Sequence, residues 1–231
     1  MPHPPIKLTW LSHGSWLIET GDSRIMLDPF LTDNPAAKSS ADSFTGITHV
    51  LVSHAHFDHI SDVARIVDRC DATLVGSFEV VQWFQKHHRV QNAVMMNVGG
   101  NCQLPGLQLK MVPAIHSSSF PDGSYGGSAA GYVLTVDQRR VYFACDTAYF
   151  GDMRFYAPGV DVAVLPIGDL FTMGIDDCLN AIKLIDPGVV LPAHYGTWPP
   201  IATDAKRWAE RVSAETAAKP VVLAVDDSYQ L

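Results

Sequence analysis

The chain has 231 residues, of which 47% are hydrophobic, and a formal net charge of -8. A chain of this length can bury one sizeable core, so we expect a single domain over residues 1–231. The 16 Lys and Arg residues face 24 acidic ones and leave no basic footprint for a phosphate backbone, which argues against nucleic acid as a partner. No uninterrupted apolar run approaches the ~18 residues of a membrane span, so we expect no membrane partner.

The cysteines and the start of the chain bear on localisation. The four cysteines are widely separated and form no C-x-x-C pair. Residues 1–5 contain no charged segment followed by an apolar run, which a secretory signal would have. Both observations predict a cytoplasmic protein with reduced thiols. The sequence leaves the formation of a homo-oligomer open.

The hydrophobic pattern predicts strands that alternate with helices. Short apolar or alternating segments indicate strands, and apolar residues spaced three or four apart indicate helices. The expected strands lie at 6–11, 15–19, 24–27, 48–52, 107–112, 131–136, 141–144, 160–165, 189–191 and 221–225, and the expected helices at 61–70, 77–87, 175–185 and 204–214. This order predicts an α/β (α+β) fold, an αββα four-layer sandwich.

The segment His54-Ala55-His56-Phe57-Asp58-His59 places four metal-binding side chains on one short turn. It follows the apolar stretch 47–52 and precedes a helical pattern, so these side chains are expected on a strand-to-helix loop. Imidazole nitrogens and carboxylate oxygens suit Zn²⁺ and, less selectively, Fe or Mn. Such a set exceeds what a single site normally takes from six residues, so the motif predicts two adjacent metals.

Three further candidate ligands each follow a predicted strand. His116 comes after the apolar run 107–115, Asp146 after 141–145, and His194 after 189–193. Side chains at the ends of such strands meet along one edge of a sheet, where open α/β sheets build their sites. The sequence therefore predicts seven ligands at one edge: His54, His56, Asp58, His59, His116, Asp146 and His194.

These residues resemble the metal ligands of the metallo-β-lactamase superfamily, and the likeness covers nearly the whole chain. Longer stretches, such as Leu11-Ser12-His13-Gly14-Ser15 and Pro192-Ala193-His194-Tyr195-Gly196-Thr197, resemble small metal-dependent hydrolases related to the ascorbate-6-phosphate lactonases. Cys145 and Asp169 depart from that subgroup, because each stands where Gly is common. The resemblance implies a four-layer sandwich of the metallo-β-lactamase type.

The resemblance also implies how two divalent metal ions would be held, with Zn expected first and Mn or Fe as alternatives. One metal would bind His54, His56 and His116, the other Asp58, His59 and His194, and Asp146 would bridge them. Two such cations about 3.5–4 Å apart share a water and lower its pKa towards ~7, so a metal-bridging hydroxide is available at neutral pH. We therefore expect hydrolysis of a small ester, lactone, amide or phosphoester.

Further residues complete the expected site. His13, Asp58 and Asp146 are expected to take part in catalysis. His13 would face the substrate or support a metal ligand, and the alternative is a hydrogen-bonded histidine of the core. Tyr195 is a candidate donor to a developing oxyanion, or it packs. Asp28 is a candidate for orienting a ligand imidazole. Cys145 is expected to be a buried small residue, since neighbouring carboxylates raise a thiol pKa.

The loops near the ligands predict the kind of substrate. Segments 34–46, 117–131 and 195–203 are expected to frame the site. The stretches 53–60, 113–131, 166–174 and 192–202 contain no Lys or Arg and supply aromatic side chains instead. We therefore expect a neutral small molecule, an uncharged lactone or ester, to be preferred over a sugar phosphate.

Two other functions use the same residues. A mononuclear iron dioxygenase of the persulfide type would keep His54, His56, His116 and Asp146 as ligands and leave the second site empty. A catalytically idle metal-binding scaffold is the third alternative, and the seven filled ligand positions argue against it. The number and kind of bound metals separate these alternatives.

Overall fold

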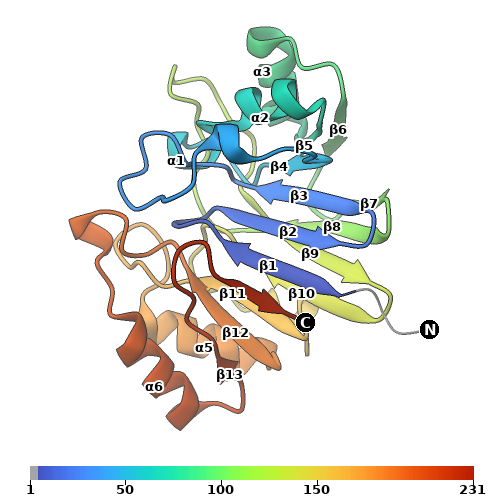
Figure 1. The fold of residues 1–231 in the computed structure, drawn as a ribbon. Helices are drawn as coiled ribbons and strands as arrows, with labels where there is room; N and C mark the ends of the chain where they lie inside the picture. The colour runs from blue at the N-terminus through green and yellow to red at the C-terminus, as the bar shows by residue number, and fades with distance from the viewer. Residues whose placement is uncertain (1–4) are drawn as a thin grey trace.

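The computed structural model describes residues 5–231. Two seven-stranded sheets pack face to face, and helices cover the outer face of each sheet (Figure 1). The predicted αββα four-layer arrangement is confirmed. Residues 1–4, which make up most of the N-terminal segment considered above for localisation, lie outside the described part of the chain.

The first sheet has the strand order β14-β1-β2-β3-β4-β5-β6. The pairs of β1 with β14, β1 with β2 and β2 with β3 are antiparallel, whereas β3 to β6 are parallel to one another. The strands are β1 (Ile6–Trp10), β2 (Trp16–Thr20), β3 (Ser23–Leu27), β4 (His49–Leu51), β5 (Thr73–Ser77), β6 (Ala93–Met96) and β14 (Ser228–Gln230). The helices of this half are η1 (Ala41–Ser43), α1 (Phe57–Ile60), α2 (Val63–Cys70) and α3 (Phe78–His88).

The second sheet has the strand order β13-β12-β11-β10-β9-β8-β7. Strands β7 to β10 are antiparallel, and β10 to β13 are parallel. The strands are β7 (Asn101–Leu104), β8 (Leu107–Pro113), β9 (Ala130–Val136), β10 (Arg139–Phe143), β11 (Val162–Pro166), β12 (Val189–Ala193) and β13 (Lys219–Pro220). The helices of this half are α4 (Met153–Tyr156), α5 (Ile175–Ile185), η2 (Pro199–Ile201) and α6 (Ala205–Glu215).

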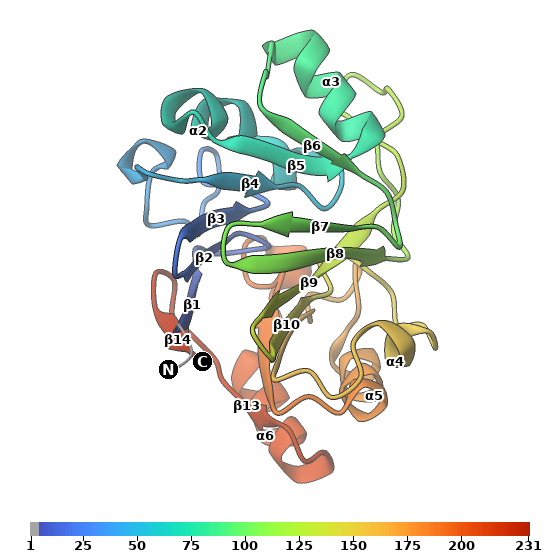
Figure 2. The ribbon, with the colours of Figure 1, turned by 90° about the vertical axis from the view of Figure 1, so that its right-hand side faces the viewer.

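Three apolar layers hold the four structural layers together. The central one lies between the sheets and includes Trp16 and Tyr132, and the outer two join the sheets to α2 and α3 and to α5 and α6 (Figure 2). Each fully buried Leu or Phe contributes about 1.5–3 kcal/mol relative to an exposed one. The hydroxyl of Tyr132 donates to the carbonyl oxygen of Val52 at 2.7 Å, so the central core also anchors the strand end that leads into the histidine-rich turn.

The predicted elements differ from the structure in two ways. Strands β5, β6, β7, β13 and β14 and the short helices α1 and α4 were not predicted, because segments of two to five residues carry too little periodicity. The predicted strand at 221–225 is wrong. Its alternating Val221, Leu223 and Val225 pack against the central core while the chain crosses from β13 to β14. The alternation therefore reports one buried face and not a paired neighbour.

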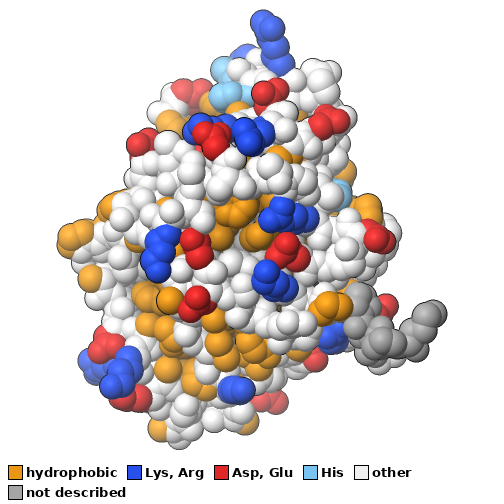
Figure 3. Space-filling model, in the orientation of Figure 1, with side chains coloured by type: hydrophobic (Ala, Val, Ile, Leu, Met, Phe, Trp, Pro, Cys, Tyr) orange, Lys and Arg blue, Asp and Glu red, His pale blue; other side chains and the backbone are white. Residues whose placement is uncertain are grey.

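The surface is mixed in character. On the face shown in Figure 3, acidic and basic side chains are interspersed, and hydrophobic side chains gather in the lower half, over the area where Figure 1 shows β12 and β13. None of the helices in the described part of the chain is long and apolar enough to cross a membrane.

Candidate metal centre

The histidine-rich turn leaves the sheet at the end of β4. His56 has an extended backbone (φ −67°, ψ 148°) and immediately precedes the single turn of α1, which carries Asp58 and His59. The amide of Ala55 lies 3.2 Å from the hydroxyl oxygen of Ser118, which ties the turn to the loop after His116. The change from extended to helical backbone lets neighbouring residues direct their side chains to one centre.

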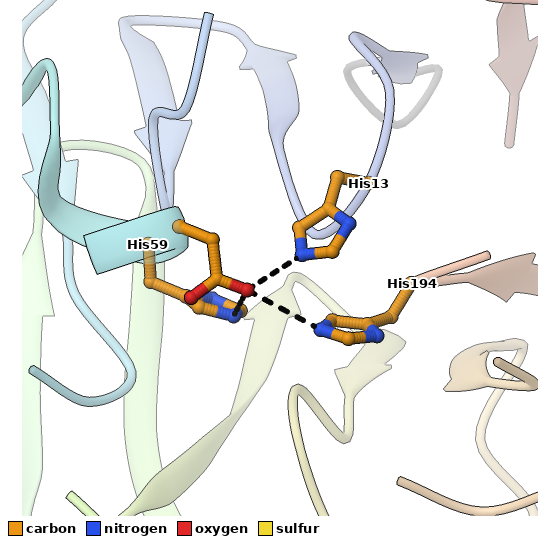
Figure 4. Close-up of side chains that lie close together, drawn as sticks. His13, His59 and His194 are labelled. Carbon is orange, nitrogen blue, oxygen red and sulfur yellow. Dashed lines mark hydrogen bonds and ion pairs between the residues drawn. The ribbon is translucent and has the colours of Figure 1, made fainter. Parts of the chain in front are cut away.

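Asp58, His59 and His194 form a group with His13, called here the buried group (Figure 4). Asp58 Oδ2 lies 3.7 Å from His59 Nε2 and 3.7 Å from His194 Nε2. His13 Nε2 is closer to the same oxygen, at 2.9 Å. The side chains of His59 and His194 are 0% and 2% exposed, so water reaches this group very little.

His54, His56 and His116 form a second group, called here the open group, in which one nitrogen of each lies within 4.8 Å of the others. His54 Nε2 is 2.9 Å from His56 Nδ1. His54 is buried, whereas His56 and His116 are half-buried. This side of the centre is the one that faces solvent.

Asp146 lies between the two groups. Its Oδ2 atom is 3.0 Å from His194 Nε2 and 3.3 Å from His59 Nε2 in the buried group, and 3.7 Å from His116 Nε2 in the open group. One carboxylate oxygen therefore approaches both groups. The structure thus brings all seven predicted side chains to one edge of the two sheets.

Asp28 links the groups from behind. His59 Nδ1 lies 2.9 Å from Asp28 Oδ2, and the hydroxyl of Ser53 lies 2.5 Å from the same oxygen and 2.9 Å from His54 Nδ1. A carboxylate only accepts, so Ser53 donates to Asp28 and accepts from His54, and His59 donates to Asp28. With Nδ1 engaged in this way, Nε2 is the atom that His54 and His59 would each offer to a metal.

His13 has a matching arrangement on the other side. It is fully buried, with Nε2 against Asp58 and Nδ1 2.8 Å from the hydroxyl oxygen of Thr197. Burial, followed by the neighbouring His194, lowers its pKa from 6.5 to about 4. The ring is therefore neutral at pH 7, and its Nε2–H donates to Asp58 while Nδ1 accepts from Thr197.

The acids and histidines of the centre shift one another's pKa values. Burial alone would lower the pKa of His194, but Asp146 and Asp58 together outweigh it and raise the value to about 9. The carboxylates of Asp146, Asp58 and Asp28 likewise outweigh burial at His59 and hold its pKa well above 6.5. Burial opposes ionisation of Asp146, but His194 and His59 hold its pKa well below the ordinary value.

Several of these residues occupy left-handed backbone conformations at strand ends. His13, Asp28, Cys145 and His194 have φ of +55°, +45°, +54° and +52°. Non-glycine residues seldom adopt this region, and those that do concentrate at functional sites. Gly adopts this conformation without strain, which agrees with the expectation that Gly is common at the position of Cys145.

The donor set fits divalent cations. His59 Nε2 and both ring nitrogens of His194 are buried, and none of them forms a hydrogen bond of normal geometry to the described residues. Buried polar nitrogens are nearly always paired, and these two Nε2 atoms face the carboxylates of Asp58 and Asp146. Imidazole nitrogens and carboxylate oxygens directed at common centres are the ligands that Zn²⁺, Fe and Mn take in proteins.

Tyr195 lies in a different setting from the other candidates. Its ring stacks on Trp10, with centroids 5.1 Å apart, and packs against the core between the sheets. Burial raises its pKa to about 12. These contacts favour the packing alternative, and the oxyanion role stays a prediction. At Cys145, burial and then Asp28 and Asp146 raise the thiol pKa well above 9.0, which fits the expected unreactive thiol.

Sequence reasoning assigned no role to Ser53 or Thr197. Each lies close to a motif residue, since Ser53 directly precedes His54 and Thr197 lies three residues after His194. A serine or threonine hydroxyl is a common partner for an imidazole, and that chemistry could have drawn attention to both. Their hydrogen bonds depend on chain segments that only the fold brings together.

Comparison with known proteins identifies the family. Residues 23–195 match the family model described as the β-lactamase superfamily domain. The chain belongs to the metallo-β-lactamase superfamily. It is similar to a metal-dependent hydrolase of Thermus thermophilus, with 43% identity over 89% of this chain and 91% of that protein. A metal-dependent hydrolase of Pelotomaculum thermopropionicum is 38% identical over 98% of this chain and 100% of that protein.

A solved structure matches closely in three dimensions. Igni18, a metallo hydrolase from Ignicoccus hospitalis, superposes with a TM-score of 0.89 and 33% sequence identity, covering 98% of each chain. The expected metallo-β-lactamase fold is confirmed by this likeness. The curated relatives named above carry the description metal-dependent hydrolase, which agrees with the donor set found here.

Proposed function

We propose that this superfamily member is a dinuclear metal-dependent hydrolase that acts on a small ester, lactone, amide or phosphoester. The observation that carries the proposal is the position of Asp146 Oδ2, within 3.0–3.7 Å of imidazole nitrogens from both the buried and the open group. Such an oxygen suits a carboxylate shared by two cations. His54, His56 and His116 would hold one metal, and Asp58, His59 and His194 the other.

The residues behind the ligands would keep the site ready for the reaction. A bound divalent pair supplies Lewis-acid activation of both water and the scissile carbonyl or phosphoryl group. Asp28 holds His59 directly and His54 through Ser53, and His13 holds Asp58. Water then adds to the acyl carbon or phosphorus, and the leaving oxygen or nitrogen departs with a proton.

Metal content is the first test. Elemental analysis of protein purified anaerobically and supplied with metals is expected to give about two metals per chain. A lactone, ester, amide and phosphodiester panel then tests hydrolysis. One iron per chain without a second metal would contradict the dinuclear site and favour the dioxygenase. A full complement of metals without turnover of any member would favour the idle scaffold.

A further inference from the structure

Large hydrophobic side chains are exposed around the candidate metal centre. Of the ten in the described chain, six lie on the segments that adjoin the ligands or follow strands at the same edge: Phe57, Ile115, Tyr125, Tyr149, Leu170 and Phe171. Single exposed hydrophobic residues are ordinary, but their concentration on the chain segments next to the ligands indicates a binding surface.

One wall of this surface is aromatic and rests on the buried group. Phe57 is 54% exposed, and its ring centroid lies 6.0 Å from that of Trp198 and 5.8 Å from that of buried Phe30. Trp198 in turn lies 5.0 Å from the ring of His13, which contacts Asp58. The wall is therefore built on the residues that position the buried group.

A second wall of exposed apolar residues is joined to Asp146 through its neighbour Thr147. The amide of Ile115 donates to the Thr147 hydroxyl at 3.0 Å, and the amide of Met173 donates to the Thr147 carbonyl at 3.1 Å. Ile115 and Phe171, which are 55% and 53% exposed, sit on these two anchored segments. Phe57 and Ile115 directly neighbour His56 and His116 in the chain, and the half-buried rings of these two histidines lie 5.1 Å apart, so both walls adjoin the open group.

The charges of these segments narrow the ligand further. The loops that carry the walls contain no Lys or Arg, whereas they contain Asp122 and Asp169. These loops therefore offer no cationic side chain of their own to an anionic group held away from the metals. An uncharged hydrocarbon group of a ligand would gain dispersion contacts with the exposed apolar side chains, and its burial from water would be favourable.

Resting on the proposed hydrolase function, we propose that the substrate is a neutral lactone or ester with an aliphatic or aromatic extension of several carbons. The extension lies between the wall of Phe57 and Trp198 and the wall of Ile115 and Phe171. Its burial there supplies the binding energy, while the polar carbonyl end lies towards the half-buried imidazoles of the open group.

Chain-length kinetics test this assignment. The metal-loaded protein is assayed with γ-butyrolactone, γ-hexalactone, γ-octalactone and γ-decalactone, and kcat/KM is expected to rise about two- to fourfold per added methylene until the walls are spanned. Calorimetry with the corresponding 3-alkylcyclopentanones, which have no bond to hydrolyse, gives a second measure, in which Kd is expected to fall by a similar factor. A phosphorylated lactone is expected to be turned over more slowly than its uncharged match.

Matched variants locate the effect. Ile115→Ser and Phe57→Ser are expected to flatten the dependence of both kcat/KM and Kd on chain length while metal content stays unchanged. Val222→Ser is the control, since Val222 is a 44% exposed aliphatic residue on the segment between β13 and β14, in neither wall. It is expected to keep the wild-type slope.

The outcomes separate this proposal from the hydrolase function. Turnover that is flat with chain length, or higher with the phosphorylated lactone, would overturn the apolar-substrate assignment and leave hydrolysis standing. No turnover together with cyclopentanone binding that follows chain length would overturn hydrolysis and leave the apolar site standing. Sedimentation that shows Phe57→Ser converting a dimer to a monomer would assign the walls to a contact between copies and overturn the proposal.

Discussion

The buried and open groups of the metal centre differ in how firmly the protein holds them. His59 and His194 are almost inaccessible, and Asp28 and His13 fix members of the buried group from outside. In the open group, His54 has a comparable support through Ser53, but His56 and His116 are half-buried. His56 Nε2 has only the hydroxyl of Ser117, at 3.3 Å, among the described residues. The chain thus combines a rigid, dry half with an accessible half.

This difference suggests a division of labour within one site. A buried group with fixed side chains loses little conformational entropy when it binds a cation, because its nitrogens already face a common centre. A group that faces solvent admits substrate and exchanges ligands more easily. Two carboxylates connect the groups: Asp146 approaches histidines of both, and Asp28 contacts His59 directly and His54 through Ser53.

The largest effect is expected from breaking the link between the halves. Asp146→Ala should abolish turnover, by about a thousandfold or more, because it removes several kcal/mol of stabilisation from both groups at once. The neighbouring Cys145→Ser should stay within about tenfold, or ~1.4 kcal/mol. Steady-state kinetics with parallel metal analysis checks both. A dead Cys145→Ser protein that retains its metals would overturn the unreactive role of the thiol.

Removing one histidine from each half sharpens the comparison. His59→Ala should lower the metal content from about two per chain to about one and cost about 3–5 kcal/mol of stability in the metal-free protein, because it leaves buried carboxylates unpaired. His116→Ala removes a half-buried ligand and should cost only ~1 kcal/mol. Denaturant unfolding of both variants measures the contrast. Equal losses of stability would show that the two halves are equally rigid.

Asp28→Asn tests the support behind the ligands. An amide can donate as well as accept, so it no longer dictates which nitrogen of His59 carries the proton. Metal affinity and kcat/KM should each fall about 10–100-fold. Competition with a fluorescent chelator gives the affinity. Unchanged affinity in this variant would mean that burial alone orients His59.

The smallest expected effect is the release of protons when metal binds. In the metal-free protein the pKa values of His59 and His194 are raised, the latter to about 9, so both rings are protonated at pH 7. Metal binding should release about two protons there, and affinity should rise with pH until about 9. Calorimetry in buffers of different ionisation enthalpy counts the protons. Affinity independent of pH between 7 and 9 would contradict these protonation states.

The same shift predicts how stability depends on pH without metal. A histidine whose folded pKa lies above its unfolded value stabilises the fold fully below the unfolded pKa. For His194 that contribution is present below pH 6.5 and is lost as pH rises towards about 9. Between pH 6.5 and about 9, the Tm of the metal-free protein should fall as pH rises. The Tm of the metal-loaded protein should fall less over the same range.

The sequence by itself was enough to predict the sandwich and the convergence of seven ligand candidates. Both follow from local signals: apolar periodicity marks which faces are buried, and His54 to His59 concentrate ligand types on one turn after a strand. His116, Asp146 and His194 were found because each directly follows a strong apolar run. Their roles as ligands stay predictions until metals are measured.

Only the tertiary structure decided which residues support the ligands and how open each half is. Ser53, Thr197 and Trp198 carry no metal-binding chemistry of their own, and their contacts join residues as far apart as His13 and Thr197. The strand at 221–225 was wrongly predicted for a related reason, since alternation shows burial but not pairing. Local sequence records what a side chain can do, whereas partners and exposure depend on long-range packing of the two sheets.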